Sequence, residues 1–201
     1  EKDINLRFAL MLGEMLEDKG FEVLYTRTDD TFIPLEERTG DANVRKADLF
    51  LSIHCNSNPL GNLQGIETYS LGKVSNDEAA RVARRENGGT ERTTGDLDVI
   101  ITDLLLYSKI EESADLAKVV HGSLVKSVKQ EFTVRDHGTR TALFHVLIGS
   151  KMPAILLELG YLSHPEEAKR LNSDEYLEQT ALGIVQGVLQ YKESLAQFAE
   201  R

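Results

Sequence analysis

The fold is decided by the stretch Ala47-Asp48-Leu49-Phe50-Leu51-Ser52-Ile53-His54-Cys55-Asn56-Ser57. Apolar residues dominate this run until it reaches the imidazole of His54. The pattern predicts a buried strand that carries one histidine to its C-terminal tip, the edge at which open α/β sheets bind ligands. His54 is therefore a candidate ligand, or else a core histidine bonded to a backbone carbonyl. Cys55 points to the opposite face of such a strand, so we expect it to be a small core residue.

A second apolar run carries a carboxylate in the same way. It reads Pro153-Ala154-Ile155-Leu156-Leu157-Glu158-Leu159-Gly160 and predicts another buried strand. An ionised Glu158 would be costly there unless it is paired or ligated. It is a candidate general base with a pKa raised by its apolar strand, or a carboxylate that caps a neighbouring helix. One histidine and one glutamate at two strand ends indicate a metal site or an acid–base site.

The rest of the chain alternates predicted helices with predicted strands. We expect helices over Asp3–Lys19, from Pro34 to about Lys46 and from Asp174 to about Leu195, and further strands over Phe21–Thr26, Gly65–Leu71 and Leu143–Leu147. This alternation predicts a largely parallel sheet covered on both faces. We therefore expect a single α/β domain over residues 1–201, with a mostly parallel open sheet, of about six strands in the complete domain, flanked by helices.

Composition excludes several classes of protein. The 201 residues are 41% hydrophobic and 28% charged, as in an ordinary globular domain. The net charge of −10 argues against a nucleic-acid partner, because affinity for phosphate rests on Lys and Arg. No apolar stretch reaches the ~20 residues of a membrane span. The chain starts at Glu1 without an initiator Met, and we interpret it as a fragment or a processed form.

Residues 73–113 break the regular pattern. A short helix is expected over Asn76–Asn87, followed by a polar, glycine-rich stretch, Gly88–Gly95. A long helix is then expected from about Leu97 to Lys129, with a bend near residues 111–115. Residues 73–113 therefore look like a helical insertion in an otherwise regular α/β unit.

Several short motifs together resemble one enzyme family, the zinc-dependent N-acetylmuramoyl-L-alanine amidases. They occur in the family's order and span nearly the whole chain. They are Glu1-Lys2-Asp3-Ile4-Asn5-Leu6, Arg27-Thr28-Asp29-Asp30, Leu35-Glu36-Glu37-Arg38, Ala42-Asn43, the run Ala47–Asn56, Gly65-Ile66-Glu67-Thr68-Tyr69, and Met152–Ser163. Each motif alone is weak, but their combination is specific.

The resemblance implies a hydrolase that cuts the amide between the lactyl group of N-acetylmuramic acid and the L-alanine of the stem peptide. The family holds zinc with two His and one Glu, which leaves an open position for catalysis. Glu1 matches the ligand Glu, His54 matches a ligand His, and Glu158 matches the catalytic Glu. The other ligand His belongs to a loop after a first strand, and we expect both to lie upstream of Glu1. His164 stands where the family commonly has Asn.

The insertion resembles the regulatory segment of cell-division amidases, in which a helix lies over the zinc. Arg84-Arg85-Glu86-Asn87 matches that segment's motif. Glu86 is thereby the candidate autoinhibitory ligand, although a glutamate on a solvated helix face would give the same pattern. Activation would then require a protein partner that draws the helix away. The apolar stretch Val99–Tyr107 either packs on the domain or docks this activator.

We therefore expect a monomeric zinc amidase that acts on peptidoglycan outside the cytoplasm, in the periplasm or elsewhere in the cell envelope, during daughter-cell separation. The main alternative is a catalytically inactive module of the same fold that binds peptidoglycan or a divisome partner. A second alternative is a zinc peptidase that cuts within the stem peptide.

Overall fold

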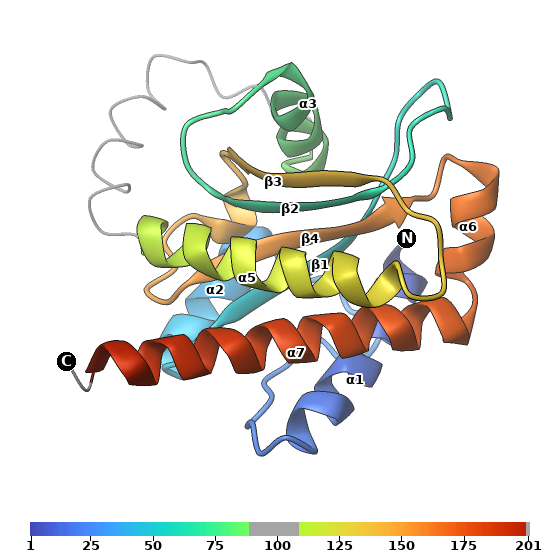
Figure 1. Ribbon diagram of the computed structural model, residues 1–201. Coiled ribbons are helices and arrows are strands. Elements are labelled where there is room, and N and C mark those ends of the chain that lie inside the picture. Colours follow the sequence, from blue (N-terminus) through green and yellow to red (C-terminus); the bar gives the residue numbers. More distant parts are fainter. Residues whose placement is uncertain (89–108, 200–201) are drawn as a thin grey trace, which may run out of the picture.

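The computed structural model describes residues 1–88 and 109–199 (Figure 1). In chain order its elements are α1 (Lys2–Glu17), α2 (Leu35–Val44), β1 (Phe50–Asn56), β2 (Ile66–Leu71), α3 (Asp77–Glu86), α5 (Ile110–Val128), β3 (Asp136–Ala142), the 3-10 turn η1 (His145–Leu147), β4 (Ala154–Tyr161), α6 (Pro165–Leu171) and α7 (Asp174–Ala199). None of the helices in these described ranges is long and apolar enough to cross a membrane.

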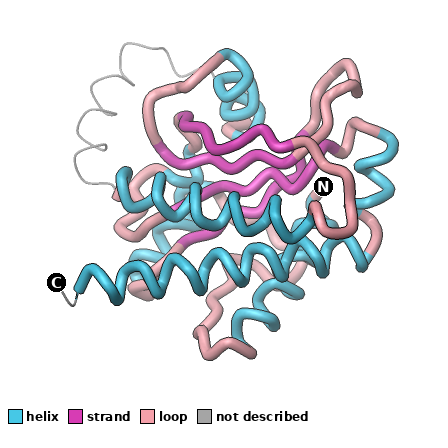
Figure 2. The backbone as a smooth tube through the Cα atoms, viewed as in Figure 1, coloured by secondary structure: helices cyan, strands magenta, loops and turns pink. Residues whose placement is uncertain are grey.

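Four strands of the described chain form one sheet in the order β1-β4-β2-β3 (Figure 2). β1 pairs with β4 in parallel, and β2 pairs with β3 in parallel. The two pairs meet where β2 runs antiparallel to β4. The expected α/β class and the mostly parallel open sheet are confirmed, with one antiparallel pair that makes the sheet mixed. The described chain supplies four strands, where about six were expected in the complete domain. β1 and β3 are its edges.

Helices cover both faces of this sheet, as expected. One face packs against α1, α5 and α7, in a core that includes Phe8, Leu124, Ile155, Leu157 and Ile184. The other packs against α2, α3 and η1, in a smaller core that includes Phe50, Tyr69, Val82, Val146 and Leu156. Because successive strand residues face opposite sides, His54 lies on the α3 face and Cys55 lies in the larger core.

Helices α5 and α7 cross at close range because small residues line their contact. A Cβ atom added to Gly187 would lie 2.6 Å from the Cα atom of Val120, and one added to Gly183 would lie 2.7 Å from the Cα atom of Leu124. Real Cβ atoms do not approach so closely. The two glycines of α7 therefore set the separation of the helices that cover one face of the sheet.

The prediction of a strand over Phe21–Thr26 is wrong. This segment is irregular in the structure, because no strand of residues 1–88 or 109–199 lies beside it to share backbone hydrogen bonds. It is separated from β1 by a cleft that residues from both segments line.

The predicted strand over Leu143–Leu147 is also wrong. The strand of this region is β3, which ends at Ala142, and His145–Leu147 form the turn η1. The helix expected from about Leu97 is described only from Ile110, and its first part lies outside the described residues, as does Val99–Tyr107. The short helix expected after Asn76 is confirmed as α3.

Candidate active site

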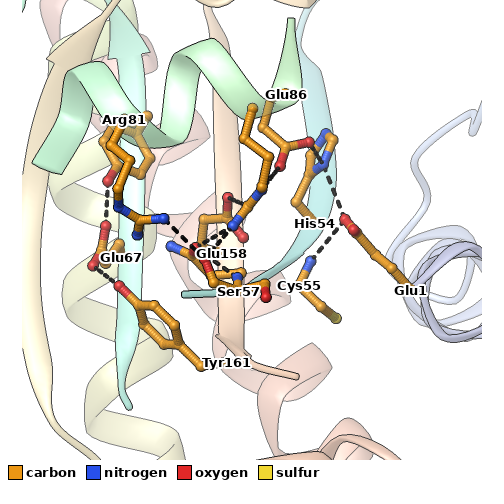
Figure 3. A network of polar contacts seen from close by, with 12 residues as sticks. Glu1, His54, Cys55, Ser57, Glu67, Arg81, Glu86, Glu158 and Tyr161 are labelled. Carbon is orange, nitrogen blue, oxygen red and sulfur yellow. Dashed lines mark hydrogen bonds and ion pairs between the residues drawn. The ribbon is translucent and has the colours of Figure 1, made fainter. Parts of the chain in front are cut away.

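His54 and Glu158 lie side by side on neighbouring strands (Figure 3). They are register partners in the parallel β1–β4 pair, near the C-terminal ends of both strands. Both face α3, and both are buried, with 8% of His54 and none of Glu158 exposed. The two apolar runs in the sequence therefore deliver an imidazole and a carboxylate to one point on the sheet edge.

Glu1 reaches the same point from the start of α1. Its Oε1 atom lies 3.4 Å from Nδ1 of His54. The same oxygen accepts hydrogen bonds from the backbone N–H of Cys55 at 3.3 Å and from the side-chain amide of Asn5 at 3.2 Å. These contacts hold the Glu1 carboxylate against the tip of β1, where Figure 3 shows it beside the imidazole.

Glu86 brings a second carboxylate from α3. It is the last residue of that helix, which begins after the N-cap Asn76, and its Oε2 atom lies 2.8 Å from Nδ1 of His54. Ligand atoms of Glu1, His54 and Glu86 all lie within 4.8 Å of one another. Within the described part of the chain, this is the group of His, Cys, Asp and Glu side chains that could hold a metal ion.

In this cluster the imidazole of His54 and the carboxylates of Glu1 and Glu86 stabilise one another's charged forms. Burial by itself would lower the pKa of His54, but hydrogen bonds and attraction from Glu1 and Glu86 outweigh it and raise the pKa to about 10. Burial would raise the pKa values of Glu1 and Glu86, yet His54 holds both below the usual 4.5. An imidazolium thus sits between two carboxylates. With one nitrogen and two oxygen ligands, this cluster suits a divalent cation in place of the proton.

Glu158 has the opposite electrostatic character. Burial raises the pKa of its carboxyl group to about 8, and the carboxylates of Glu86 and Glu1 add to the shift, although His54 and Arg85 oppose it. Arg85 lies 3.4 Å from Oε1. Oε2 is buried and finds no hydrogen-bond partner among the described residues. A buried carboxyl with one unpartnered oxygen and a pKa near neutrality is suited to transferring protons.

Arg85 joins α3 to the strand ends. Its guanidinium bonds Oε1 of Glu86 at 2.6 Å, Oδ1 of Asn56 at 2.7 Å and the carbonyl of Ser57 at 2.6 Å. Arg81, one turn earlier, donates to the same carbonyl of Ser57 at 3.1 Å. The two arginines therefore hold α3 over His54 and Glu158. Figure 3 shows this helix above both side chains.

Three residues of this region were not predicted from the sequence. They are Arg85, Ser52, whose hydroxyl lies 3.0 Å from Nε2 of His54, and Glu67, the register partner of Glu158 on β2. Glu67 stands in a polar strand, so no apolar run marked it.

Three other histidines lie apart from this cluster. His121 lies between the hydroxyl of Thr68 at 2.9 Å and the carboxylate of Asp136 at 2.8 Å. His137 lies in β3, and its Nε2 atom is 2.8 Å from the carbonyl of Gln64. His164 occupies the N-cap position of α6.

A cleft of about 1270 Å³ opens beside the site. Its wall includes the consecutive residues Phe21–Arg27 on one side and the consecutive residues Phe50–His54 on the other. Consecutive strand residues point to opposite faces, so a cavity that touches all of them must face the strand's edge. The cleft is therefore a slot between two extended segments, and it ends at the metal-ligand cluster.

Comparisons with known proteins agree with this geometry. The model of the N-acetylmuramoyl-L-alanine amidase family matches residues 1–190, and the chain belongs to this family. The protein YqiI of Bacillus subtilis is 30% identical over 95% of the chain and 74% of its own length. The amidase AmiA of Escherichia coli is 29% identical over 95% of the chain and 68% of its own length.

A solved structure shows the same fold. The N-acetylmuramoyl-L-alanine amidase of Clostridium difficile 630 superposes with a TM-score of 0.72 and is 36% identical, covering 96% of this chain and 84% of its own. The α/β fold with its edge site is thus an amidase fold, and the chain is an N-acetylmuramoyl-L-alanine amidase by family.

Proposed function

We propose that this protein hydrolyses the amide bond between N-acetylmuramic acid and L-alanine in peptidoglycan, with zinc as its cofactor. The observation that carries the proposal is the convergence of Glu1, His54 and Glu158 at the C-terminal ends of β1 and β4. The family membership supports the substrate, since relatives such as AmiA carry the name of this activity.

Glu1 and His54 would hold the zinc ion. One carboxylate and one imidazole are ligands that zinc commonly takes. When bound, the ion supplies a Lewis acid that polarises the scissile carbonyl. The contacts of Glu1 with the backbone of Cys55 and with Asn5 fix its carboxylate, and the hydroxyl of Ser52 fixes the imidazole of His54 through its other nitrogen.

A further histidine would complete the ligand set, carried by an extended segment in the cleft beside β1. The slot suits a strand, because β1 is an edge strand and Phe21–Arg27 runs along the other wall. A strand there would bond the free edge of β1 and reach His54 at one end. It would also pair with the segment over which a strand was expected from the sequence, Phe21–Thr26.

Glu158 would carry the protons of the reaction. Its unpartnered Oε2 atom can accept a proton from the attacking water and then donate it to the leaving amine of L-alanine. Its apolar strand keeps the carboxyl group dry, and a nearby cation would favour the ionised form that acts as a base. Arg85 occupies the other oxygen only while α3 lies over the site.

The closed position of α3 would be autoinhibitory. Glu86 lies at the ligand cluster, and Arg85 contacts the carboxylate of Glu158. The helix would therefore block both the metal site and the proposed proton carrier. We propose that a protein activator withdraws α3 during cell separation in the cell envelope. A chain confined there would meet peptidoglycan and activator together, and the net charge of −10 gives no affinity for nucleic acid.

The test is the mass of the products. Zinc-loaded protein would be incubated with purified peptidoglycan, with a chelator-treated sample and a Glu158→Gln variant as controls. Intact stem peptides with a free L-alanine amine, and glycans with free lactyl carboxylates, are expected only from the active sample. Fragments of stem peptides would instead identify a peptidase. Binding to peptidoglycan without products would identify an inactive binding module.

A further inference from the structure

The strand that carries Glu158 is irregular just beyond it. His54 pairs with Glu158, but Asn56 pairs with Tyr161, so three steps on β4 face two steps on β1. Within this bulge Gly160 has a φ of +153°, a conformation that side chains disfavour. Bulges beside active sites re-aim neighbouring side chains. The direction of the Glu158 carboxylate therefore depends on what fixes the bulge.

The carboxylate of Glu167 fixes the bulge from α6. Its Oε2 atom accepts the backbone N–H of Tyr161 at 2.7 Å, and its two oxygens lie 2.9 and 3.0 Å from the backbone nitrogen of Gly65. Glu167 is only 2% exposed. It thus joins the end of β4 to the residue before β2. A Cβ atom at Gly160 would stand 3.4 Å from Oε2, so the carboxylate lies directly against the bulge.

A second buried carboxylate, that of Glu67, holds the side chain of Tyr161. The hydroxyl of Tyr161 donates to Oε1 of Glu67 at 2.6 Å. Glu67 is fully buried and is the register partner of Glu158 across the β2–β4 pair. Tyr161 is therefore held by its backbone and by its hydroxyl, from two different elements, three residues after Glu158.

The carboxylate of Glu167 bonds to strand ends rather than to its own helix, α6. A glutamate in the first turn of a helix commonly accepts the free N–H groups there. The hydrogen bonds that this carboxylate makes in the described chain go to Gly65 and Tyr161, on two strand ends. Its neighbour Glu166 is the ordinary case, an exposed side chain paired with Lys169. Two adjacent glutamates thus have different surroundings.

We propose that Glu167 is a positioning residue for Glu158. By clamping the backbone of Tyr161 to that of Gly65, it holds the β4 bulge in the shape that directs the Glu158 carboxylate toward His54. The inference rests on the proposed role of Glu158 in hydrolysis. It predicts that Glu167 affects the rate of the chemical step and leaves substrate binding and zinc binding unchanged.

The experiment compares Glu167→Gln and Glu167→Ala with the control Glu166→Ala. Gln keeps the size of the side chain but replaces one accepting oxygen with a donor, and Ala removes both acceptors. Misplacing a catalytic group by about 1 Å costs on the order of 100-fold in rate. We expect kcat to fall on the order of 10-fold for Gln and 100-fold for Ala, with KM within about twofold and zinc content unchanged.

The outcomes separate the two proposals. Wild-type kcat in Glu167→Gln and Glu167→Ala would overturn the positioning role, as would a fall in kcat matched by a loss of zinc. Equal effects in Glu166→Ala would overturn it too. If Glu167→Ala does not fold, Glu167→Gln decides the question. Retained hydrolysis in Glu158→Gln would refute the proposed function itself, whereas an inactive Glu158→Gln beside fully active Glu167 variants would refute the positioning role alone.

Discussion

The proposed autoinhibition by α3 predicts that removing the Glu86 carboxylate opens the site. In Glu86→Ala the oxygen 2.8 Å from His54 disappears, together with the bonds from Arg85 to the same carboxylate. Arg85 keeps its contacts with Asn56 and Ser57, so α3 loses part of its hold on the strand ends. Alanine is also the best helix former, so the helix itself should persist.

The expected size of the effect follows from the lost contact. The Glu86–His54 pair is an ion pair, with 2.8 Å between Oε2 and Nδ1, and the two side chains are each 11% exposed. A contact of this kind between charged groups contributes about 2 kcal/mol, and each 1.4 kcal/mol corresponds to a tenfold change in an equilibrium. If closed molecules predominate, the open population should rise about 30-fold. Basal hydrolysis should rise by the same factor.

Release of soluble fragments from dye-labelled peptidoglycan measures this basal rate. The matched control is Arg84→Ala, because Arg84 is an exposed residue of α3 two positions away. We expect Arg84→Ala to behave as the wild type. Zinc-loaded Glu86→Ala with an unchanged rate would refute the inhibitory role of α3, and equal activation by Arg84→Ala would show that the effect is not specific to the carboxylate.

Three further predictions test the site and the fold. Glu158→Gln should lower the rate at least about 100-fold. Its unfolding free energy, measured in urea, should also gain on that of the wild type between pH 4.5 and about 8, because the unfolded wild type ionises Glu158 in this range while the native state keeps the proton, so wild-type stability falls. Zinc affinity, measured against a competing chelator, should rise about tenfold per pH unit below the His54 pKa of about 10, because zinc displaces that proton; a pH-independent affinity would exclude His54 as a ligand. Gly187→Ala should destabilise by about 1–3 kcal/mol against the backbone of α5, whereas Gly122→Ala, which meets no atom within 4 Å, should stabilise by up to about 1 kcal/mol; equal unfolding free energies would contradict the close packing of α5 and α7.

The elements predicted correctly are those whose residues carry their own pattern. β1 and β4 are apolar runs, and α1 and α7 have helical periodicity. Phe21–Thr26 has the composition of a strand, but a strand also needs a partner, which composition does not reveal. β3 was missed for the opposite reason, since its polar residues Asp136–Ala142 form a strand only because β2 lies beside them.

The residues of the candidate site also differ in how far the sequence alone identifies them. His54 and Glu158 stand out because a polar residue in an apolar run needs a reason to be there. Glu1 and Glu86 were selected only through a family resemblance, because a first residue and a helical glutamate are usually solvated. Nothing in the sequence distinguishes Glu167 from its neighbour Glu166. Its partner Gly65 is 102 residues away, and a contact across that separation leaves no local signal.

The zinc content of the purified chain, measured by elemental analysis without added metal and again after zinc is offered, tests the central claim most directly. We predict one zinc ion per chain, reduced in Glu1→Ala and in His54→Ala and retained in Glu158→Gln. A ratio near zero that persists after zinc is offered, or a full ratio that survives the loss of His54, would contradict the assignment of this cluster as the metal centre.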